Sequence, residues 1–578
     1  METKTQPQTM EANTMKKQRM SGSEAVMKSL LHEGVDVLFG YPGGAIMPIY
    51  DALYHYQEKL NHILTRHEQG AVHAAQGYAR VTGQVGVCFV TSGPGATNAV
   101  TGIADAMVDS TPMVVISGQV ASPLLGTDAF QETDVVGITQ PITKWNYQVK
   151  RAEEIPEAIA KAFYIARSGR PGPVLIDITK DAQFAQFDFE YKKVKKVRSY
   201  IPKTAVKADK VAEAVRLINL AKKPLALVGQ GVVLGGAEKE LMAFLEKTGI
   251  PAAWTLLGLS AMPSDFEQNV GMLGMHGNYG PNVKTNESDL IIAIGMRFDD
   301  RVTGNVQKYA KGAKVVHLEI DPAEINKIIY ADVPVVGDVK DSLPMITDMV
   351  SKTSHEAWLK EFKACDKIEK QKIIDEQLFP TKAGLTMGEV VRRVTDHYDD
   401  NAIMVTDVGQ HQMFASRYFK FKQTRSVVTS GGLGTMGFGL PAALGAQLGQ
   451  PERPVCLFVG DGGFQMTIQE LGTIFQTQAP VKIILLNNNF LGMVRQWQEM
   501  FFDRRYASTE LVNPDFQTIT KGYGIACEQV SERDDLDAAV KRMAEHEGAY
   551  LLEVKVEKEG NVFPMVTTGA SVSEIILE

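Results

Sequence analysis

The stretch from Gly460 to Val494 reads GDGGFQMTIQELGTIFQTQAPVKIILLNNNFLGMV, and the organisation of the chain is clearest around it. An apolar run, Val455–Val459, ends in Gly460-Asp461-Gly462. A helix-like segment follows, and then a second apolar run, Val481–Leu486, ends in Asn487-Asn488. Two buried-strand patterns around a helix predict a βαβ unit. Both polar motifs then lie where strands end, which is the edge at which α/β sheets bind ligands.

The two motifs also contain ligands for a hard cation. Asp461 supplies a carboxylate oxygen and Asn488 an amide oxygen. Both suit Mg²⁺, because this ion keeps few protein ligands and takes the rest from phosphates and water. The glycines let the backbone approach a diphosphate closely. A GDG by itself most often marks an ordinary turn at a strand end, so the pairing with NN is what predicts a cofactor site.

GDG followed by NN at the end of the next strand resembles the cofactor motif of the thiamine-diphosphate-dependent decarboxylase and carboligase superfamily. The resemblance implies that Asp461, Asn488 and the main chain of Phe490 hold the metal. It also gives Met436 a catalytic role, wedged between the two thiamine rings, although composition alone favours core filler there. Further cofactor contacts implied by the resemblance are Gln410, His411, Gly434, Gly460, Gly462 and Gly463.

Length and composition limit the class of protein. A chain of 578 residues is too long for one core and predicts three or four domains. Its formal net charge of −8 indicates no basic field for nucleic acid. The four cysteines show no CxxC spacing, which excludes a zinc ribbon and favours a reducing compartment. No apolar run is long enough to span a membrane and no signal peptide is evident, so we expect a cytoplasmic protein.

Alternating strand-like and helical patterns predict an α/β protein, and with the resemblance we expect three doubly wound parallel-sheet domains. The polar opening predicts a disordered tail. The resemblance assigns the thiamine pyrimidine to the first domain, FAD to the central one, and the diphosphate with Mg²⁺ to the third. The expected division is a tail over 1–20, the pyrimidine-binding domain over 21–188, a basic linker over 189–206, the central FAD-associated domain over 207–351, a helical connector over 352–378, and the diphosphate-binding domain with a C-terminal lid over 379–578.

Glu68 is the residue of the first domain on which the chemistry would depend. It begins an Ala-rich helix, where a carboxylate could simply complement the helix dipole. The segment RHEQGA, residues 66–71, is however similar to the one that contains the glutamate contacting the aminopyrimidine in this family. The resemblance implies that Glu68 exchanges a proton with that ring. It also implies catalytic roles for Gly44, Gln131 and Lys180, and a place beside the substrate channel for Phe130.

The central domain has several glycine turns after strand-like runs. A loop such as Gly229-Gln230-Gly231 is a weak dinucleotide signal, and composition would not name the cofactor. The stretch RFDDRVTG, residues 297–304, resembles the FAD-binding segment of the acetohydroxyacid synthase family, which implies FAD across this domain. The implied FAD contacts are Arg170, Gly229, Gly231, Gly274, Met275, His276, Gly277, Gly295, Arg297, Asp299, Arg301, Glu319, Ile320, Asp321 and Asp338.

Met493, Val494 and Trp497 follow the NN motif at helical spacing, and such a stripe is usually core. The resemblance assigns them to the substrate pocket and implies that Trp497 favours 2-ketobutyrate as second substrate. An indole wall can reward an extra methylene by roughly 1–3 kcal/mol.

The resemblance covers nearly the whole chain and implies an acetolactate-forming enzyme of branched-chain amino-acid (valine, leucine and isoleucine) biosynthesis. Pyruvate would be decarboxylated on thiamine diphosphate, and the two-carbon unit joined to pyruvate or 2-ketobutyrate, giving 2-acetolactate or 2-aceto-2-hydroxybutyrate. FAD would be bound without a net redox role. In this family one subunit supplies the glutamate and its neighbour the metal site. That implies a homodimer, or a tetramer, with a small regulatory subunit as a further partner.

Three other interpretations stay open. A pyruvate oxidase would use the same cofactors, with FAD as a redox centre, and would consume oxygen. A simple decarboxylase would release acetaldehyde. A non-catalytic nucleotide-binding module would require Glu68, Asp461 and Asn488 to be a coincidence, and replacing Glu68 with glutamine would then leave turnover unchanged.

Overall fold

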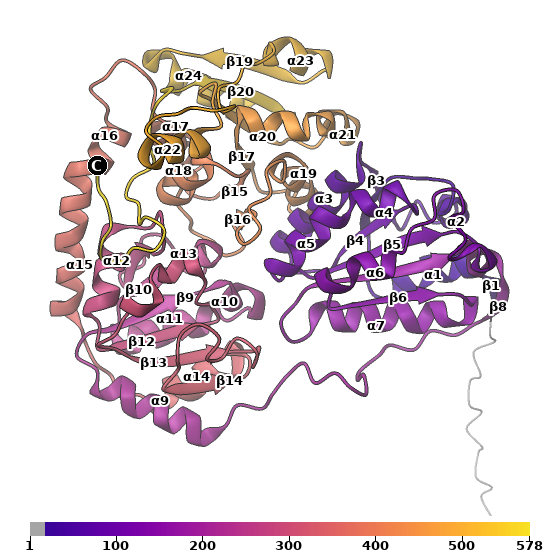
Figure 1. Cartoon of the computed structure of the whole chain (residues 1–578), viewed down its shortest axis with the longest axis horizontal. Coiled ribbons are helices and arrows are strands. Elements are labelled where there is room, and N and C mark those ends of the chain that lie inside the picture. The colour runs from indigo at the N-terminus through magenta and orange to yellow at the C-terminus, as the bar shows by residue number, and fades with distance from the viewer. Residues whose placement is uncertain (1–17) are drawn as a thin grey trace, which may run out of the picture.

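Three α/β lobes follow one another along the chain (Figure 1), and the computed structural model describes residues 18–578. Each lobe is built on a six-stranded parallel sheet, which confirms the predicted fold class. Within residues 18–578, no helix combines the length and the apolar character needed to cross a membrane.

The tail expected over residues 1–20 lies mostly outside the described residues, but its last three residues are structured. Gln18–Ser21 forms strand β1, which pairs antiparallel with β8 (Gln186–Phe189). The side chain of Met20 is buried against the first lobe, and this burial offsets the entropy lost on ordering the strand. The prediction of disorder is therefore wrong for residues 18–20.

The first lobe contains the sheet β3-β2-β4-β5-β7-β6. Its strands are continuous apolar runs, such as the fully buried GVCFV of β4, because helices cover both faces. The strands are β2 (Val37–Gly40), β3 (Asn61–Leu64), β4 (Gly86–Val90), β5 (Met113–Gln119), β6 (Trp145–Val149) and β7 (Pro173–Thr179). The helices are α1 (Gly22–His32), α2 (Met47–Tyr54), α3 (Glu68–Thr82), α4 (Pro94–Asn98), α5 (Val100–Val108), α6 (Val135–Thr139), α7 (Ile155–Arg167) and α8 (Lys180–Phe184).

The third lobe repeats this design with the sheet β16-β15-β17-β18-β20-β19. Numbered from its own first strand, each of these two sheets has the order 2-1-3-4-6-5. The strands are β15 (Ile403–Thr406), β16 (Val427–Val428), β17 (Val455–Gly460), β18 (Lys482–Asn487), β19 (Ala526–Val530) and β20 (Tyr550–Lys555). The helices are α17 (Met387–His397), α18 (Gln410–Tyr418), α19 (Gly439–Gly449), α20 (Asp461–Met466), α21 (Leu471–Thr477), α22 (Gly492–Phe501), α23 (Phe516–Gly522) and α24 (Arg533–Glu545).

The central lobe differs, because its sheet β11-β10-β9-β12-β13-β14 has the order 3-2-1-4-5-6. This is the dinucleotide-binding order, whose ligand crevice opens between the first and fourth strands, here β9 and β12. The strands are β9 (Pro224–Val228), β10 (Ala252–Trp254), β11 (Asn269–Met272), β12 (Leu290–Ile294), β13 (Lys314–Glu319) and β14 (Val333–Val336). The helices are α9 (Ala208–Leu220), α10 (Gln230–Gly235), α11 (Glu238–Thr248), α12 (Tyr279–Glu287), α13 (Asp300–Thr303) and α14 (Val339–Met349).

The third sheet packs against both other lobes. Along β17, the side chains of Leu457 and Val459 join the core shared with the first lobe, whereas Cys456 and Phe458 join the core shared with the central lobe. This alternation follows from the two-residue period of a strand. The first and third lobes meet where α3 crosses α19 (Figure 1). There a Cβ at Gly77 would lie only 2.0 Å from the carbonyl oxygen of Ala442, so the close crossing requires glycine.

A helical connector joins the central and third lobes. It consists of α15 (Glu356–Glu369), a π-helical turn (Lys370–Ile374) and α16 (Asp375–Leu378), and it runs along one side of the molecule (Figure 1). The last residue of α15, Glu369, forms a fully buried ion pair with Arg417 of α18. Glu369 also accepts a hydrogen bond from the backbone N–H of Tyr279 at 2.7 Å, so one carboxylate ties the connector to both lobes.

Candidate active site and cofactor cavities

The ends of β17 and β18, which pair side by side, surround a small cavity of about 50 Å³ in the third lobe. Asp461 begins α20 directly after β17, and Asn488 directly follows β18. The predicted residues that line this cavity are Gln410, His411, Met436, Gly460, Asp461, Gly462, Gly463, Asn488, Phe490, Met493 and Val494. The metal and diphosphate residues predicted from the sequence therefore lie together.

The oxygen atoms around Asp461 suit a magnesium ion. Burial raises the pKa of this carboxyl to about 6, so a cation beside it would stabilise its charged form. Its Oδ2 accepts a hydrogen bond from Nδ2 of Asn513 at 2.6 Å. Among the described residues, no three His, Cys, Asp or Glu side chains form a group able to hold a metal. One carboxylate, the Asn488 amide and a main-chain carbonyl fit Mg²⁺, which takes its other ligands from phosphate and water.

His411 provides the clearest sign that a polar ligand belongs in this cavity. Burial lowers the pKa of its ring to about 3, so the imidazole is neutral. Its Nε2 atom is buried without a hydrogen-bond partner. A Cβ at Gly460 would lie 2.8 Å from its Nδ1, so glycine keeps this corner open. Unpaired buried polar atoms are rare, and a diphosphate oxygen would satisfy this one.

Met436 forms a wall shared by the small cavity and a much larger one. It belongs to residues 430–438, called here the 430–438 loop, between β16 and α19. Asp407, directly after β15, holds the end of this loop, because its carboxylate accepts hydrogen bonds from the N–H groups of Gly437 at 3.1 Å and Gly439 at 2.8 Å. The position of Met436 is therefore set by backbone bonds to a buried carboxylate.

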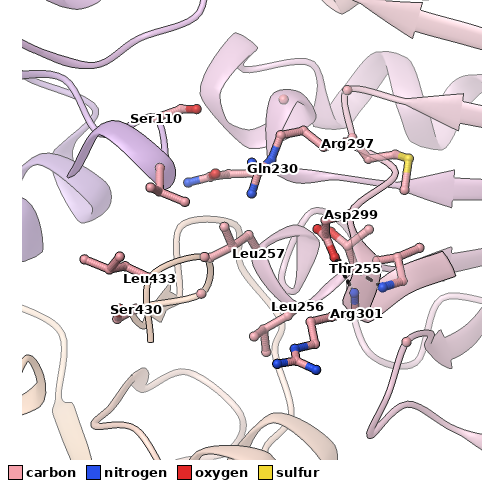
Figure 2. Close-up of a pocket in the computed structure, with 18 of the residues that line it drawn as sticks. Ser110, Gln230, Thr255, Leu256, Leu257, Arg297, Asp299, Arg301, Ser430 and Leu433 are labelled. Carbon is pink, nitrogen blue, oxygen red and sulfur yellow. Dashed lines mark hydrogen bonds between the residues drawn. The ribbon is translucent and has the colours of Figure 1, made fainter. Parts of the chain in front are cut away.

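The larger cavity lies where the three lobes meet, and its volume is about 960 Å³. Figure 2 shows Ser110 entering from the first lobe, Gln230 and Arg297 from the central lobe, and Ser430 and Leu433 from the third. This volume is at the upper end of the range for ligand pockets, which run from roughly 300 to 1,000 Å³. A large cofactor that touches all three lobes fits the space.

The polar groups of the larger cavity fit the predicted flavin nucleotide. Both ring nitrogens of His276 are buried without partners, and burial lowers its pKa to about 4. Burial raises the pKa of Glu319, at the end of β13, to about 7. Arg170 is oriented by Ser110 Oγ, 2.9 Å from its Nε, and by Glu324 Oε1, 2.8 Å from its Nη1. Unpaired polar groups beside the crevice of a 3-2-1-4-5-6 sheet are what a dinucleotide needs.

Most residues predicted to contact FAD line this cavity, namely Arg170, Gly231, Gly274, Met275, His276, Gly295, Arg297, Asp299, Arg301, Glu319, Ile320 and Asp338. Gly434 and Trp497 line it as well. Three predicted residues, Gly229, Gly277 and Asp321, do not. The two glycines serve backbone packing, since a Cβ would lie 2.2 Å from a carbonyl oxygen at Gly229 and 2.6 Å from one at Gly277. Asp321 forms an ion pair with Arg170 at 3.5 Å.

Several residues of these sites have no signal in the sequence. Leu257 and Leu433 point into the larger cavity from different lobes (Figure 2). Asn513 contacts Asp461 from a loop beyond α22. Asp407, directly after β15, contacts the backbone next to Met436 from a different strand end. Each contact joins parts of the chain that are far apart in sequence, so local motifs could not predict it.

The residues predicted at the active site in the first lobe gather at the carboxyl ends of its own strands. Glu68 is buried at the start of α3, and its Oε2 accepts a hydrogen bond from Asn98 Nδ2 at 3.0 Å. Lys180, directly after β7, donates from Nζ to the carbonyl oxygen of Gly44 at 3.2 Å. Gln131 has a left-handed backbone with φ 60° and packs beside the Gly93 turn.

These first-lobe residues do not share a cavity with Asp461 in the single chain. None of Gly44, Glu68, Phe130, Gln131 and Lys180 lines either cavity described above. The ring of Phe130 is 87% exposed. The predicted residues therefore form two separate groups in one chain, one at the edge of the first sheet and one at the edge of the third.

Comparison with known proteins finds matches to all three lobes. Residues 20–138 match the N-terminal TPP binding domain of thiamine pyrophosphate enzymes, 211–346 match the central domain, and 407–554 match the C-terminal TPP binding domain. The chain is 46% identical over 569 residues to the acetolactate synthase large subunit of Corynebacterium glutamicum, covering 96% of this chain and 90% of that protein. The chain belongs to the acetolactate synthase family.

Other members of the acetolactate synthase family have a similar sequence identity to this chain. The isozyme 2 large subunit of Escherichia coli is 45% identical, over 96% of this chain and 99% of that protein. A probable acetolactate synthase large subunit of Methanocaldococcus jannaschii is 44% identical, over 96% and 95%. In this acetolactate synthase family member, the two thiamine-binding domains are the two lobes with the same strand order, and thiamine diphosphate is the cofactor they bind.

Proposed function

We infer that this protein is the catalytic large subunit of an acetolactate synthase. It decarboxylates pyruvate and joins the two-carbon unit to a second 2-ketoacid. The product is 2-acetolactate with pyruvate and 2-aceto-2-hydroxybutyrate with 2-ketobutyrate, as branched-chain amino-acid biosynthesis requires. The near-full-length similarity to acetolactate synthase large subunits, together with the three thiamine pyrophosphate enzyme domains, is the observation on which this conclusion rests.

The two thiamine-binding lobes would divide the chemistry. When bound, thiamine diphosphate supplies the electron sink that lets the carboxyl group leave as carbon dioxide. Asp461, Asn488 and the main chain of Phe490 would hold Mg²⁺ beside the diphosphate, in keeping with their oxygen donors. Glu68 would exchange a proton with the aminopyrimidine, and Asn98 orients its carboxyl group through the 3.0 Å hydrogen bond.

A second copy of the chain would complete each site. Glu68 and Asp461 share neither cavity within one chain, which supports a homodimer in which the first lobe of one subunit meets the third lobe of the other. Whether two such dimers join as a tetramer does not affect this pairing. The relatives are named large subunits, which supports a small regulatory subunit as a further partner.

The remaining predicted residues have roles in the same scheme. FAD would occupy the cavity between the lobes without a net redox role. Met493 and Val494 line both cavities and Trp497 lines the larger one, so they would receive the second 2-ketoacid. Lys180, Gln131 and Gly44 would act from the partner's first lobe, with Phe130 at the substrate channel. Three of the four free cysteines are buried, in keeping with a cytoplasmic location.

The product spectrum tests this function. Purified protein with Mg²⁺, thiamine diphosphate and FAD would receive pyruvate, with and without 2-ketobutyrate, while oxygen is followed. We expect acetolactate and, with the second ketoacid, acetohydroxybutyrate, without matching oxygen uptake. Acetate or acetyl phosphate with equivalent oxygen loss would instead identify a pyruvate oxidase. Acetaldehyde as the main product would identify a simple decarboxylase.

A further inference from the structure

A cluster of buried charged residues in the first lobe lies against the 430–438 loop of the third lobe. Asp105 on α5 and Asp109 directly after it are fully buried. Arg80, near the end of α3, has a side chain only 6% exposed, and its Nη2 lies 2.9 Å from Asp109 Oδ2 and 3.9 Å from Asp105 Oδ2. Buried charges are costly unless paired and hydrogen-bonded, so the partners of this cluster indicate what it does.

Those partners are in the 430–438 loop, more than 320 positions away in sequence. Asp109 accepts hydrogen bonds from the backbone N–H groups of Gly431 at 2.8 Å and Gly432 at 2.7 Å. Asp105 Oδ1 accepts one from the hydroxyl of Thr435 at 2.8 Å and another from Ser430 Oγ. The cluster therefore holds the loop on both sides of Leu433 and up to the residue before Met436.

Packing leaves the loop little freedom to move. A Cβ at Gly432 would lie 2.2 Å from Val108 Cγ1 and 2.9 Å from Asp109 Oδ1, so the loop backbone lies directly on the first lobe. A Cβ at Gly431 would lie 2.8 Å from the Leu257 side chain of the central lobe. The loop is thus held between two lobes. Because Asp109 accepts hydrogen bonds from backbone N–H groups, these bonds fix the path of the loop backbone and not only the position of one side chain.

The 430–438 loop also forms walls of both cavities. Residues 430–434 line the larger cavity, and Met436 lines both. A displacement of the loop would therefore change the space offered to both cofactors at once. This distinguishes the loop from Asp461 and Asn488, which line only the small cavity.

We propose that Asp105 and Asp109 are positioning residues, which act through the 430–438 loop to align Met436 and the adjoining wall of the FAD cavity. This inference rests on the proposed function of both cavities. It also connects the two parts of the site, because α3 begins at Glu68 and has Arg80 near its other end. The lobe that offers Glu68 to a partner chain would thereby align the thiamine site of its own chain.

A purely structural role, stabilising the contact between lobes, is the competing explanation, and the chain offers a matched control. Glu33 of the first lobe has a fully buried carboxylate that pairs with Arg167 Nη2 at 2.9 Å and accepts a hydrogen bond from Tyr191. It makes no contact with the 430–438 loop. Glu33→Gln therefore removes a buried charge of the same kind, in the same lobe, without affecting the loop.

The experiment compares full-length wild type, Asp109→Asn and Glu33→Gln. In Asp109→Asn an amide NH₂ faces a backbone N–H of the loop, so one bond is lost. We expect the Kd of FAD, from flavin fluorescence, to rise about tenfold, as the loss of one charge-assisted bond predicts. We expect kcat to fall about tenfold to a hundredfold, since small misplacements near the reacting atoms have that cost, while KM for pyruvate changes less. Glu33→Gln should lower the melting temperature but leave the FAD Kd and kcat within about twofold of wild type.

A double-mutant cycle tests the proposed route of action. One oxygen of Asp105 accepts both loop bonds, so asparagine would keep the acceptor and alanine is needed to remove it. Asp105→Ala and Ser430→Ala remove the two sides of one hydrogen bond, so the double variant should lose no more FAD affinity than the more affected single variant. Additive losses would overturn the route through Ser430. A folded Asp109→Asn protein with the FAD affinity and kcat of Glu33→Gln would overturn the proposal itself. If wild type forms no acetolactate, the proposed function fails, whereas the FAD titrations still decide the positioning role.

Discussion

The first and third lobes have the same sheet, with strand order 2-1-3-4-6-5, and yet different chemical groups lie at the ends of their strands. In the first lobe, the carboxyl ends of the strands present Glu68 and Lys180, which suit proton transfer and substrate contact. In the third lobe, the same edge presents Asp461 and Asn488, which suit a metal and a diphosphate. The fold decides where a site forms, and the residues of the strand-end turns decide what it does.

The two edges also differ in how complete they are. In the third lobe, burial raises the pKa of the Asp461 carboxyl to about 6 and leaves Nε2 of His411 without a hydrogen-bond partner, so this edge suits a cation and a polar ligand. In the first lobe, Glu68 already has the Asn98 amide as a partner, whereas Phe130 lies exposed. In the proposed function, a cofactor would fill the edge of the third lobe and a partner chain would cover the edge of the first. Substitutions on the two edges should therefore fail in different ways.

The largest effect should come from Glu68→Gln. If Glu68 acts only in proton transfer, kcat should fall by about 10²–10⁴-fold, while the Kd of thiamine diphosphate stays within a few-fold of wild type. Asn98→Ala, which only removes the orienting amide, should cause a smaller loss of kcat. Steady-state kinetics and cofactor titration measure both. Loss of thiamine diphosphate binding in Glu68→Gln would mean that the first lobe holds the cofactor rather than activating it.

The opposite pattern is expected for Asp461→Asn. Removing a direct metal ligand should weaken Mg²⁺-dependent binding of thiamine diphosphate by more than the roughly 10–100-fold typical of residues that only support a ligand. Asn513→Ala, which removes such a support, provides the control. Calorimetric titration at several Mg²⁺ concentrations separates the two. Equal affinities for Asp461→Asn and wild type would remove the metal site from the third lobe.

A pH-dependent effect should come from the contact between the two lobes. His73 of α3 is fully buried, 5.1 Å from the ring of Phe438, and burial lowers its pKa from 6.5 to about 3. The unfolded chain therefore binds a proton below pH 6.5 that the folded chain does not, so stability is complete above pH 6.5 and is lost as pH falls. His73 should cost about 2 kcal/mol of stability at pH 5.

Urea unfolding of wild type and His73→Gln at pH 5 and pH 7 measures this contribution. We expect the free energy of unfolding of wild type to drop more between these pH values than that of the variant, by about 2 kcal/mol. Equal drops would show that His73 does not titrate on unfolding in this range.

The smallest effect should be on substrate choice. Trp497→Leu should reduce the preference for 2-ketobutyrate over pyruvate by about 1 kcal/mol, or roughly fivefold in the product ratio, because a pocket rewards one methylene only weakly. Phe501→Leu is the control, since Phe501 packs on Trp497 at 4.9 Å but does not line the cavity. Competition between the two ketoacids gives the ratio. An unchanged ratio in Trp497→Leu would place the second substrate elsewhere.

The elements around the site were predictable because their signals are local. The apolar runs predicted before Asp461 and Asn488 are β17 and β18 to within one residue at each end. By contrast, the edge strand β6 has only one buried residue and gives no apolar run. The prediction of disorder failed at residues 18–20 because their strand partner, β8, lies far along the chain.

Within the site, the same distinction holds. The ligands predicted at Asp461 and Asn488 follow from motifs at strand ends, where residue type and position coincide. Leu257 of the central lobe and Leu433 of the third lobe line the same cavity. Asp109 accepts a hydrogen bond from Gly431 of the 430–438 loop, which lies 322 positions further along the chain. Such contacts depend on how the lobes pack, which a linear pattern does not contain. Sequence motifs therefore indicated thiamine diphosphate, which the family comparison supports, but not the contacts between lobes.

The central claim is that Glu68 and Asp461 of one chain belong to different active sites. Mixing Glu68→Gln and Asp461→Asn subunits, unfolded and refolded together or co-expressed, tests it directly. In a mixed dimer, one site would combine an intact first lobe with an intact third lobe. Random pairing should then restore about a quarter of wild-type activity from two inactive variants. Activity that stays at the level of the separate variants, with mixed dimers shown to form, would mean that each chain builds its own complete site.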